Sequence, residues 1–426
     1  LILTCFLRGI VPFPKYVPPS ELGAVMPLMQ FANFLAIPIA AFANTFRNEL
    51  TQLSIKKEFG RLKTLMRGVF IASAVFIFIA TLIAHFALPA FLERIRIAEG
   101  SLGLIIIATS FVSAISPIYS NALQALKKFK AQSVISIIGA PIRLLTMLVT
   151  MPFRALSGYF IGQASIPIVN ITASVIALKK ELSVKAEPYW DRETVRKFSK
   201  LVLIFFMMTA SSCLSGLVES TIIRQRLSNV DSAGYYMATR FSEIATYLYG
   251  AMIFAFFPLA AELNTNDNKA HIKFVLKSAI ANILFCLIIT LVFCFIGQQI
   301  LHLLPHADLY ATYWWAIPWL IMVTGITSLH GFYTTAEIAA NRFGFLKWAI
   351  PLDLTYPVIL LLITGHGYFT GTIPSSWTNF LQIHNIYSLS TMLWWMTAIS
   401  IIKSLICLIV LITKKANAGR SRASPA

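Results

Sequence analysis

The sequence predicts an all-α membrane protein, a polytopic bundle of helices, and three observations lead to that prediction. First, its 426 residues are 57% hydrophobic and only 12% charged, whereas soluble domains carry about 25% charged residues. Second, eleven apolar runs are long enough for helices that cross a bilayer, which takes about 20 residues each. Third, Lys and Arg gather in every second gap between those runs, as the positive-inside rule describes.

The predicted spans follow from the apolar runs alone. Several contain an internal proline, which neighbouring helices can tolerate in a membrane bundle and which often marks a moving helix. The spans are expected at 23–45, 68–91, 102–124, 132–153, 156–178, 200–223, 234–262, 274–303, 311–338, 345–365 and 386–412. The internal prolines are Pro38, Pro117, Pro141, Pro167, Pro318 and Pro357.

The basic gaps orient the chain. Together they contain 25 of the 35 Lys and Arg residues, so we expect them, and the C-terminus, to face the cytoplasm. The net charge of +18 would suggest nucleic acid in a soluble protein, but short basic loops beside apolar runs favour anionic membrane lipids as the partner. The basic segments are 46–67, 125–131, 179–200, 263–277, 339–347 and the tail after 412.

Parity predicts one more helix. Eleven spans with a cytoplasmic C-terminus place the start of the first span outside, yet residue 1 is Leu and residues 1–6 look like the end of a helix. We therefore expect twelve spans in two six-helix lobes, with the first helix largely missing from this sequence; a cleaved signal peptide is the alternative. The expected divisions are an N-terminal lobe (1–178), a cytoplasmic inter-lobe loop (179–199), a C-terminal lobe (200–412) and a basic cytoplasmic tail (413–426).

A weak parallel repeat agrees with two lobes. Gly23 and Gly234 each open a span, lie 211 residues apart, and are each followed by a basic loop at nearly the same offset. Parallel two-lobe repeats are typical of transporters whose lobes rock about a central substrate site.

Short motifs in the second half resemble a known family. They are the segment 218–223, the Gly-x-Tyr-x-Ala helix start within 231–240, and a Phe-Pro pair at 257–258. The starts at 21–23 and 191–200 and the turn at 339–342 also fit. The chain resembles bacterial polysaccharide (O-antigen type) flippases of the multidrug/oligosaccharidyl-lipid/polysaccharide (MOP) exporter superfamily, although it lacks the proline often found where the run at 200 begins.

That resemblance implies a MATE-like, alternating-access transporter of the bacterial inner membrane. It would move an undecaprenyl-pyrophosphate-linked oligosaccharide from the inner to the outer leaflet for lipopolysaccharide or another cell-surface polysaccharide. A polysaccharide polymerase and glycosyltransferases are the implied partners. No cofactor, metal or nucleic acid is expected, and H⁺ and Na⁺ are the candidate coupling ions.

Charged side chains inside the predicted spans are the candidate site residues, because a charge at mid-bilayer costs about 3 kcal/mol on insertion scales. We expect Arg240, Arg143 and Arg47 to bind the substrate, since a guanidinium stays charged and grips phosphate oxygens in pairs. Arg240 ranks first because the family resemblance places basic residues on the cavity face of its helix. Arg143 lies mid-span, and Arg47 lies at the inner mouth.

The acidic residues inside spans are candidates for ion coupling or ion pairing. Alternative interpretations stay open: Arg240 pairs with an acid three residues on, Arg143 pairs with Asp353 or with backbone carbonyls, Arg47 anchors the inner surface, and Glu219 is solvated at the outer interface. The acidic candidates are Glu243, Asp353, Glu219 and Glu337.

Two further ionisable side chains lie in predicted spans. Lys403 is expected to snorkel toward the cytoplasmic headgroups. His330 is a candidate proton carrier, but we favour a structural histidine with satisfied hydrogen bonds.

Two other functions compete with the flippase. A cation-coupled multidrug antiporter of the same fold would need buried carboxylates, and the predicted first lobe shows none inside its spans. A membrane-embedded glycan polymerase or ligase would need catalytic residues on a large outer loop, but the loop at 366–385 has no acid and only two histidines, His366 and His384. We therefore expect a transporter and not an enzyme.

Overall fold

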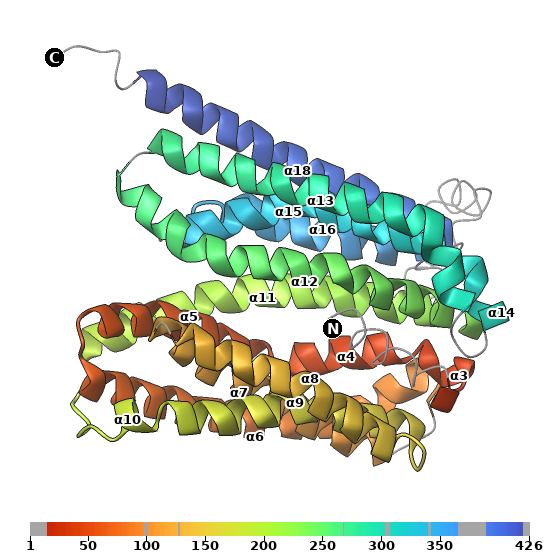
Figure 1. Cartoon of the computed structure of the whole chain (residues 1–426), viewed down its shortest axis with the longest axis horizontal. Coiled ribbons are helices and arrows are strands. Elements are labelled where there is room, and N and C mark those ends of the chain that lie inside the picture. The colour runs from red at the N-terminus through yellow and green to blue at the C-terminus, as the bar shows by residue number, and fades with distance from the viewer. Residues whose placement is uncertain are drawn as a thin grey trace. The chain divides into compact units, whose positions relative to one another are not determined.

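The computed structural model describes residues 15–97, 101–126, 128–266, 268–302, 307–339, 342–364 and 389–420, and this part of the chain is helical with short turns and no strand. Figure 1 shows the helices in chain order. They are α3 Pro19–Leu22, α4 Val25–Leu35, α5 Ile37–Ile55, α6 Phe59–Arg94, α7 Ser101–Ala125, α8 Phe129–Thr150, α9 Ala155–Ala177, α10 Lys179–Leu182, α11 Arg192–Arg226, α12 Asn229–Asn266, α13 Asn268–His302, α14 Ala307–Tyr310, the 3₁₀ turn η1 Ala311–Tyr313, α15 Ala316–Ala339, α16 Leu346–Thr364 and α18 Leu389–Arg420.

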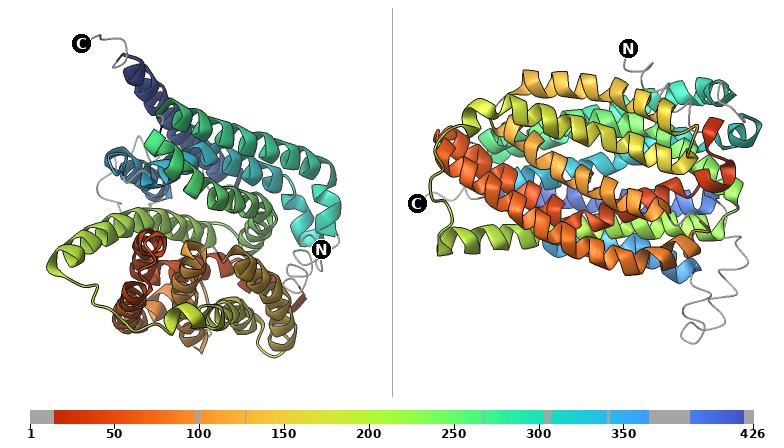
Figure 2. Two further views of the ribbon diagram at one scale, coloured as in Figure 1. Left: turned by 60° about the vertical axis from the view of Figure 1, so that its left-hand side comes forward. Right: turned by 90° about the horizontal axis from the view of Figure 1, so that it is seen from below.

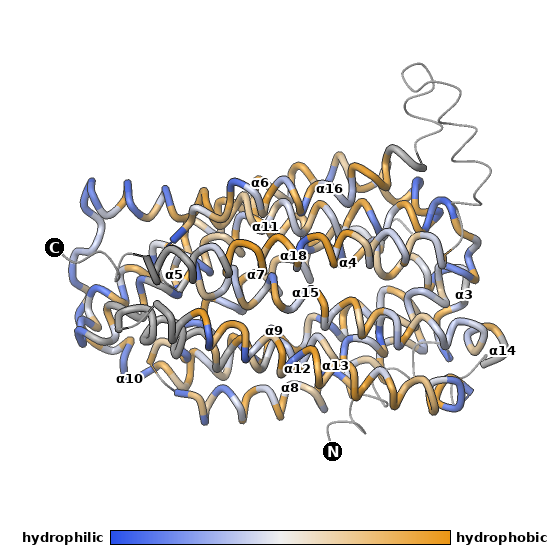
Figure 3. Tube along the Cα trace, turned by 90° about the horizontal axis from the view of Figure 1, so that it is seen from above, coloured by the Kyte–Doolittle hydropathy of each residue, from blue (hydrophilic) through white to orange (hydrophobic). Residues whose placement is uncertain are grey.

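The helices confirm the predicted all-α membrane bundle. Each of the eleven predicted spans overlaps a helix, and in the described residues eight helices are long and apolar enough to cross a membrane, or nine if one bent pair counts as a single span. Along several helices apolar residues fill the middle stretch while hydrophilic residues gather at the ends (Figure 3). The helix end predicted at 1–6 and the outer loop predicted at 366–385, with both its histidines, lie outside the described residues.

The first predicted span is broken and not continuous. It consists of α4 and α5, which meet at Ala36 with a bend of 59° between the stretches Ser20–Leu35 and Ile37–Arg47. Pro38 lies in the first turn of α5 and has no N–H to donate to the residue four positions earlier. The internal proline thus coincides with a bend that is sharp enough to divide the span into two helices.

The chain forms two compact units, unit 1 (Leu1–Gln225) and unit 2 (Arg226–Ala426). This division differs from the predicted one at 179–199, because α11 groups with the first unit. Its contacts explain the grouping: the guanidinium of Arg224, 1% exposed, donates to the carbonyls of Ile95 at 3.0 Å and Ser20 at 2.5 Å. Near the middle of the helix, Gly216 packs against the side chain of Gln30.

Unit 1 is a helical bundle in which polar side chains join apolar helices. Figure 2 views its helices along and across their axes. The amide of Asn170 in α9 donates to the hydroxyls of Ser116 at 2.5 Å and Ser120 at 2.7 Å in α7. The amide of Asn121 in α7 donates to the carbonyl of Ala43 in α5 at 2.8 Å. Such hydrogen bonds add specificity where lipid-facing and helix-facing surfaces are equally apolar.

Unit 2 uses the same device between α15 and α18. The indole N–H of Trp319 donates to the Thr397 hydroxyl at 2.7 Å, and the Ser404 hydroxyl donates to the Ile326 carbonyl at 2.6 Å. α15 also packs along α12 and α13. At the start of α12, Asp231 accepts hydrogen bonds from Ser228 at 2.6 Å and from Tyr313.

Candidate functional site

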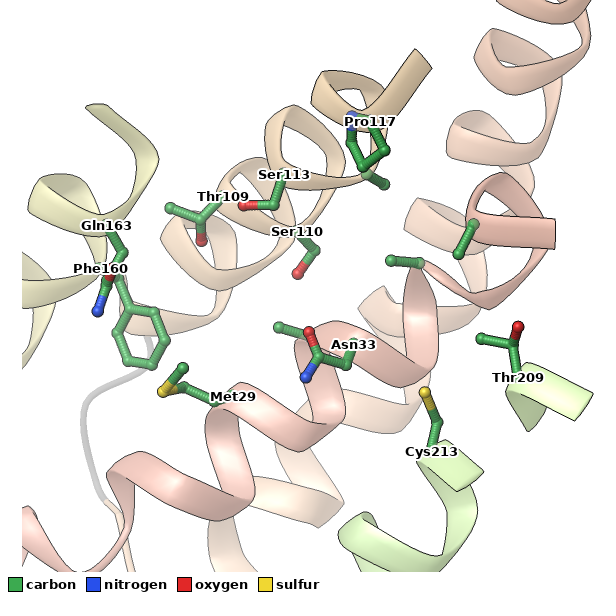
Figure 4. A pocket seen from close by; sticks show the side chains of 14 residues that line it. Met29, Asn33, Thr109, Ser110, Ser113, Pro117, Phe160, Gln163, Thr209 and Cys213 are labelled. Atoms are coloured by element: carbon green, nitrogen blue, oxygen red, sulfur yellow. The ribbon is translucent and has the colours of Figure 1, made fainter. Parts of the chain in front are cut away.

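Unit 1 contains a cavity of about 320 Å³ that we take as the candidate site. Figure 4 shows side chains that converge on it from α4, α7, α9 and α11. Its size suits part of a ligand and not a whole oligosaccharide, since binding pockets typically measure about 300–1,000 Å³. The lining residues are Met29, Ala32, Asn33, Ala36, Ala40, Thr109, Ser110, Ser113, Ala114, Pro117, Phe160, Gln163, Thr209 and Cys213.

The bend between α4 and α5 makes room for the cavity. Ala32, Ala36 and Ala40 line it at intervals of four residues, a spacing that puts side chains on one face of a helix. Because each contributes only a methyl group, this wall leaves space where larger residues would fill the bundle. The amide of Asn33 lies on the same wall, beside the break.

α7 supplies hydroxyl groups on the opposite wall. The hydroxyl of Thr109 donates to the carbonyls of Ile105 at 2.6 Å and Ile106 at 2.9 Å, and that of Ser110 donates to Ile106 at 2.6 Å. Since both hydroxyls donate their hydrogen bonds to carbonyls of their own helix, they can only accept hydrogen bonds from a ligand. One turn on, Ser113 lines the cavity, and its carbonyl receives no helical hydrogen bond because Pro117 has no N–H.

α9 contributes an anchored amide and an aromatic ring. The Gln163 amide donates to the Tyr159 hydroxyl at 2.5 Å, and that hydroxyl contacts the Met29 sulfur of α4 at 3.3 Å. Phe160, 3% exposed, presents its ring between them (Figure 4). Held in this way, the amide keeps one orientation, and the ring offers a flat apolar surface beside polar groups.

The lining carries no ionised side chain. Every lining residue is Ala, Pro, Met, Phe, Cys, Ser, Thr, Asn or Gln, and among the described residues no hydrogen bond engages Asn33, Ser113 or Thr209 side chains. Amides and hydroxyls both donate and accept hydrogen bonds. The cavity therefore suits a neutral ligand group that is rich in hydroxyls or amides, with an apolar face for Phe160.

None of the seven residues predicted from charge lines this cavity. Arg240 and Glu243 confirm the pairing interpretation, since their side chains form an ion pair at 2.7 Å within α12. The guanidinium also donates to the Tyr236 hydroxyl at 2.8 Å and stacks over its ring at 4.9 Å. The charge of our first-ranked arginine is thus compensated inside unit 2.

Asp353 and Lys403 pair with each other. The carboxylate of Asp353 in α16 binds the Lys403 ammonium of α18 at 2.7 Å, so Asp353 has a partner other than Arg143, whose pairing with Asp353 was one of the open alternatives. The expected snorkelling of Lys403 to the headgroups is wrong, because its ammonium turns to a helix partner. The buried Nε2 of His330 makes no hydrogen bond within the described part of unit 2, so the expectation of a satisfied histidine is wrong as well.

The remaining predicted residues lie on four different helices, α5, α8, α11 and α15. Arg143 is half-buried on α8, and within the described chain it forms neither a hydrogen bond nor an ion pair. Arg47 lies at the end of the apolar stretch Ile37–Arg47, and its role at the inner mouth stays a prediction. Glu219 is 8% exposed on α11, which contradicts solvation, and Glu337 is 5% exposed near the end of α15.

Charge-based reasoning missed the neutral residues of the cavity. A charge inside a span draws attention, whereas Ser, Thr, Asn and Gln are ordinary in membrane helices. The available signal was proximity to proline: Asn33 precedes Pro38 by five residues, and Ser113 precedes Pro117 by four. Irregular backbone in membranes is tolerated where it lines a cavity, so amides and hydroxyls near internal prolines mark such a place.

Comparison with known proteins identifies the fold. No protein-family model and no curated protein sequence matches the chain. Among solved structures, an inward-facing multidrug resistance MATE family transporter of the MOP superfamily is 11% identical with a TM-score of 0.67, over 99% of this chain and 96% of that chain. A MATE protein in its straight conformation is 11% identical with a TM-score of 0.67, over 98% and 93%.

A third similar structure is a MOP superfamily transporter from Pyrococcus furiosus whose binding pocket has reverse polarity, which suggests a different function for that protein. It is 11% identical to this chain, with a TM-score of 0.66 over 98% of this chain and 93% of that chain. At these identities the likeness concerns architecture. The chain has the fold of MATE family transporters of the MOP superfamily.

Proposed function

We propose that this chain is a membrane transporter that moves a lipid-linked oligosaccharide from the inner to the outer leaflet of the bacterial cytoplasmic membrane, for cell-surface polysaccharide synthesis. The observation that carries the proposal is the neutral, hydroxyl- and amide-rich lining of the unit 1 cavity. The fold supports transport in general, and the lining favours a glycan among the possible cargoes.

The chemistry of a sugar fits that lining. Its hydroxyls both donate and accept, as do Asn33, Gln163 and Ser113. Its C–H face is apolar and packs on aromatic rings, which Phe160 provides. Thr109 and Ser110 present acceptors and no spare donor, so they favour a ligand group that donates hydrogen bonds. One or two sugar units would occupy about 320 Å³, with the rest of the glycan outside.

Arg143 is the best-placed partner for the pyrophosphate in this proposal. It lies one helical turn before Met147, and Met147 packs directly on Gly162, the neighbour of Gln163 in the cavity wall. A guanidinium with no ion-pair partner in the described residues is available for an anion, whereas Arg240 is held by Glu243. We therefore rank Arg143 above Arg240, the reverse of the order expected from sequence.

A cation-coupled multidrug antiporter is the second candidate, and one observation favours it. Glu219 is 8% exposed in α11 and belongs to unit 1, which extends beyond the lobe predicted at 1–178, so unit 1 contains a buried carboxylate. Glu219 is not among the residues that line the cavity. A cationic drug in that cavity would therefore meet no opposite charge, which favours the oligosaccharide.

The test is reconstitution of the purified chain in liposomes with two cargoes. The first is a fluorescent polyprenyl-pyrophosphate oligosaccharide, scored by its accessibility to an enzyme or quencher outside, and the second is a cationic dye. We expect protein-dependent movement of the lipid-linked glycan and none of the dye. Asn33→Leu and Ser113→Leu should each reduce glycan movement at least about tenfold, the equivalent of about 1.4 kcal/mol of lost interaction.

The matched control is Thr172→Leu, a substitution of similar size on an exposed face of α9, which should leave the rate unchanged. Dye transport that depends on Glu219, with no glycan movement by a folded protein, would contradict the proposal and support the antiporter. Equal loss in all three leucine variants would show a general packing effect and would remove the cavity from the mechanism.

A further inference from the structure

Unit 2 contains a part-buried ion pair between two of its apolar helices. The carboxylate of Asp353 in α16 and the ammonium of Lys403 in α18 are 2.7 Å apart, and their side chains are 21% and 16% exposed. The two residues lie 50 positions apart in sequence, so the pair joins two helices and does not stabilise one helix locally.

His330 of α15 lies near this pair, and its ring packs in a T-shaped arrangement with the ring of Trp348 of α16, with the centroids 5.9 Å apart. Its Nε2 is buried and accepts or donates no hydrogen bond in the described residues. On α18, Ser404 donates to the Ile326 carbonyl of α15 at 2.6 Å, so α18 contacts both α15 and α16 at neighbouring positions, Ser404 and Lys403.

A carboxylate in this position needs a positive charge. Removing a single ion from water to a membrane interior is expensive, and a lone carboxylate would take up a proton or a cation instead. An ammonium is a compact charge of one unit with three donors, and it is close in size to a potassium ion. Here that ion is attached to the chain through a four-carbon stem, and the side chain is 16% exposed.

We propose that Asp353 forms a monovalent-cation site in unit 2 and that the Lys403 ammonium is its resident, covalently tethered cation. The native chain then needs no dissolved cation at this carboxylate. Removal of the ammonium should open the site to a free monovalent ion of similar size, with ammonium and potassium as the natural occupants. This inference concerns unit 2 alone and does not depend on which cargo the transporter carries.

A purely structural ion pair makes a different prediction. If Lys403 merely joins two helices, its loss destabilises the chain and no dissolved ion repairs the damage, because a free ion cannot bridge helices as a tethered side chain does. If the carboxylate is a cation site, a dissolved ion restores the missing charge and much of the lost stability, since a ligand that binds only the folded state stabilises it by mass action.

The experiment measures thermal unfolding of the full chain in detergent at constant ionic strength. The Lys403→Gln variant is purified in N-methyl-D-glucamine chloride. Ammonium, potassium or sodium chloride then replaces this salt stepwise. We expect the melting temperature of the variant to rise by several degrees and to saturate as the concentration of the small cation increases. The melting temperature of the native chain should change by less than one degree. A stabilisation of about 1 kcal/mol raises the unfolding midpoint of a large domain by about 2–4 °C.

Two further variants decide the interpretation. Asp353→Asn combined with Lys403→Gln has no charge at the site and should fold without responding to any cation. Lys403→Gln that folds only when a small cation is present throughout purification also supports the proposal. A Lys403→Gln protein that is equally stable in all four salts, or that fails to fold even in ammonium and potassium chloride, would overturn it.

Discussion

Unit 1 and unit 2 both join helices through neutral polar side chains, but they differ in how they place the charged residues predicted from sequence. Unit 1 gathers neutral hydroxyls and amides around a cavity and leaves Arg143 without an ion-pair partner in its described helices. In the described part of unit 2, two ion pairs compensate charges inside helices, Arg240 with Glu243 and Asp353 with Lys403. The difference teaches that a charge inside a span is not by itself a sign of a substrate site. A compensated charge already has its partner within the chain, whereas neutral polar groups around a cavity can bind a ligand.

The largest expected effect falls on Arg143. If unit 1 binds the cargo, Arg143→Ala should reduce transport of a pyrophosphate-linked lipid at least about tenfold, because the guanidinium is the charge that offsets the crossing of an anion. The double variant Arg240→Ala/Glu243→Gln removes the compensated pair of unit 2 and should retain at least half of the native rate. The liposome assay with the fluorescent lipid-linked glycan measures both.

Thermal unfolding of the two proteins serves as the control, since each must remain folded for its rate to be interpretable. Normal transport by Arg143→Ala together with loss in the paired variant would reverse the comparison and return Arg240 to the first rank, as the sequence alone predicts. Equal loss in both would place the anion path in both units.

The sequence predicts the helices and the ion pairs between neighbouring residues far better than it predicts contacts between distant residues. Eleven apolar runs each overlap a helix, because the thickness of the hydrocarbon and the need to satisfy backbone hydrogen bonds leave few alternatives. Local pairs were also predictable: Glu243 follows Arg240 by three residues, which puts both on one helix face. Pro38 indicates a break in the first span, although the sequence does not predict the position of the bend.

The non-local features were beyond the sequence. Asp353 and Lys403 are 50 residues apart, and nothing in the sequence selects Lys403 over Arg143 as the partner of Asp353. Likewise α11 packs in unit 1 through Arg224 and Gly216. The periodicity of the sequence does not predict these contacts, so the boundary between the two units differs from the one expected at the longest basic loop. The cavity depends on which faces of four helices meet, and that information arises only when the helices pack.

The second prediction compares the ends of the two units, beginning with unit 1. Arg224 donates to the carbonyls of Ile95 and Ser20 and is 1% exposed. Replacing it with Met should destabilise the chain by about 3 kcal/mol, because hydrogen bonds to a charged group are strong and the carbonyls of Ile95 and Ser20 lose their donor. Arg226→Met, at an exposed position two residues on, should change the free energy of unfolding by less than about 0.5 kcal/mol.

Thermal or denaturant unfolding in detergent measures both variants. A loss of stability in Arg224→Met no greater than in Arg226→Met would mean that water replaces the guanidinium at those carbonyls. The grouping of α11 with unit 1 would then rest on apolar packing alone.

The smallest expected effect concerns the corresponding end of unit 2, where Asp231 accepts hydrogen bonds from Ser228 and Tyr313. Burial by itself would raise the pKa of Asp231, but these hydrogen bonds outweigh it and hold that pKa below its ordinary value. Tyr313→Phe keeps the ring that packs on Gly234 and removes the hydroxyl. It should cost about 1 kcal/mol at pH 7.

The sign of the pH dependence separates this contact from simple packing. A carboxyl whose pKa is lowered on folding contributes stability above its unfolded pKa of about 3.9, and that contribution disappears as the pH falls through the folded pKa. The difference in stability between the native chain and Tyr313→Phe should therefore be constant from pH 7 to about pH 5 and shrink below about pH 4. Unfolding midpoints measured across that range test it, with Tyr310→Phe, a buried tyrosine beside the same turn, as the matched control. If the stability difference between the native chain and Tyr313→Phe persists unchanged at the lowest pH, the effect comes from packing of the ring. This end of unit 2 would then be stabilised by an apolar contact, whereas the corresponding end of unit 1 is stabilised by a buried charge.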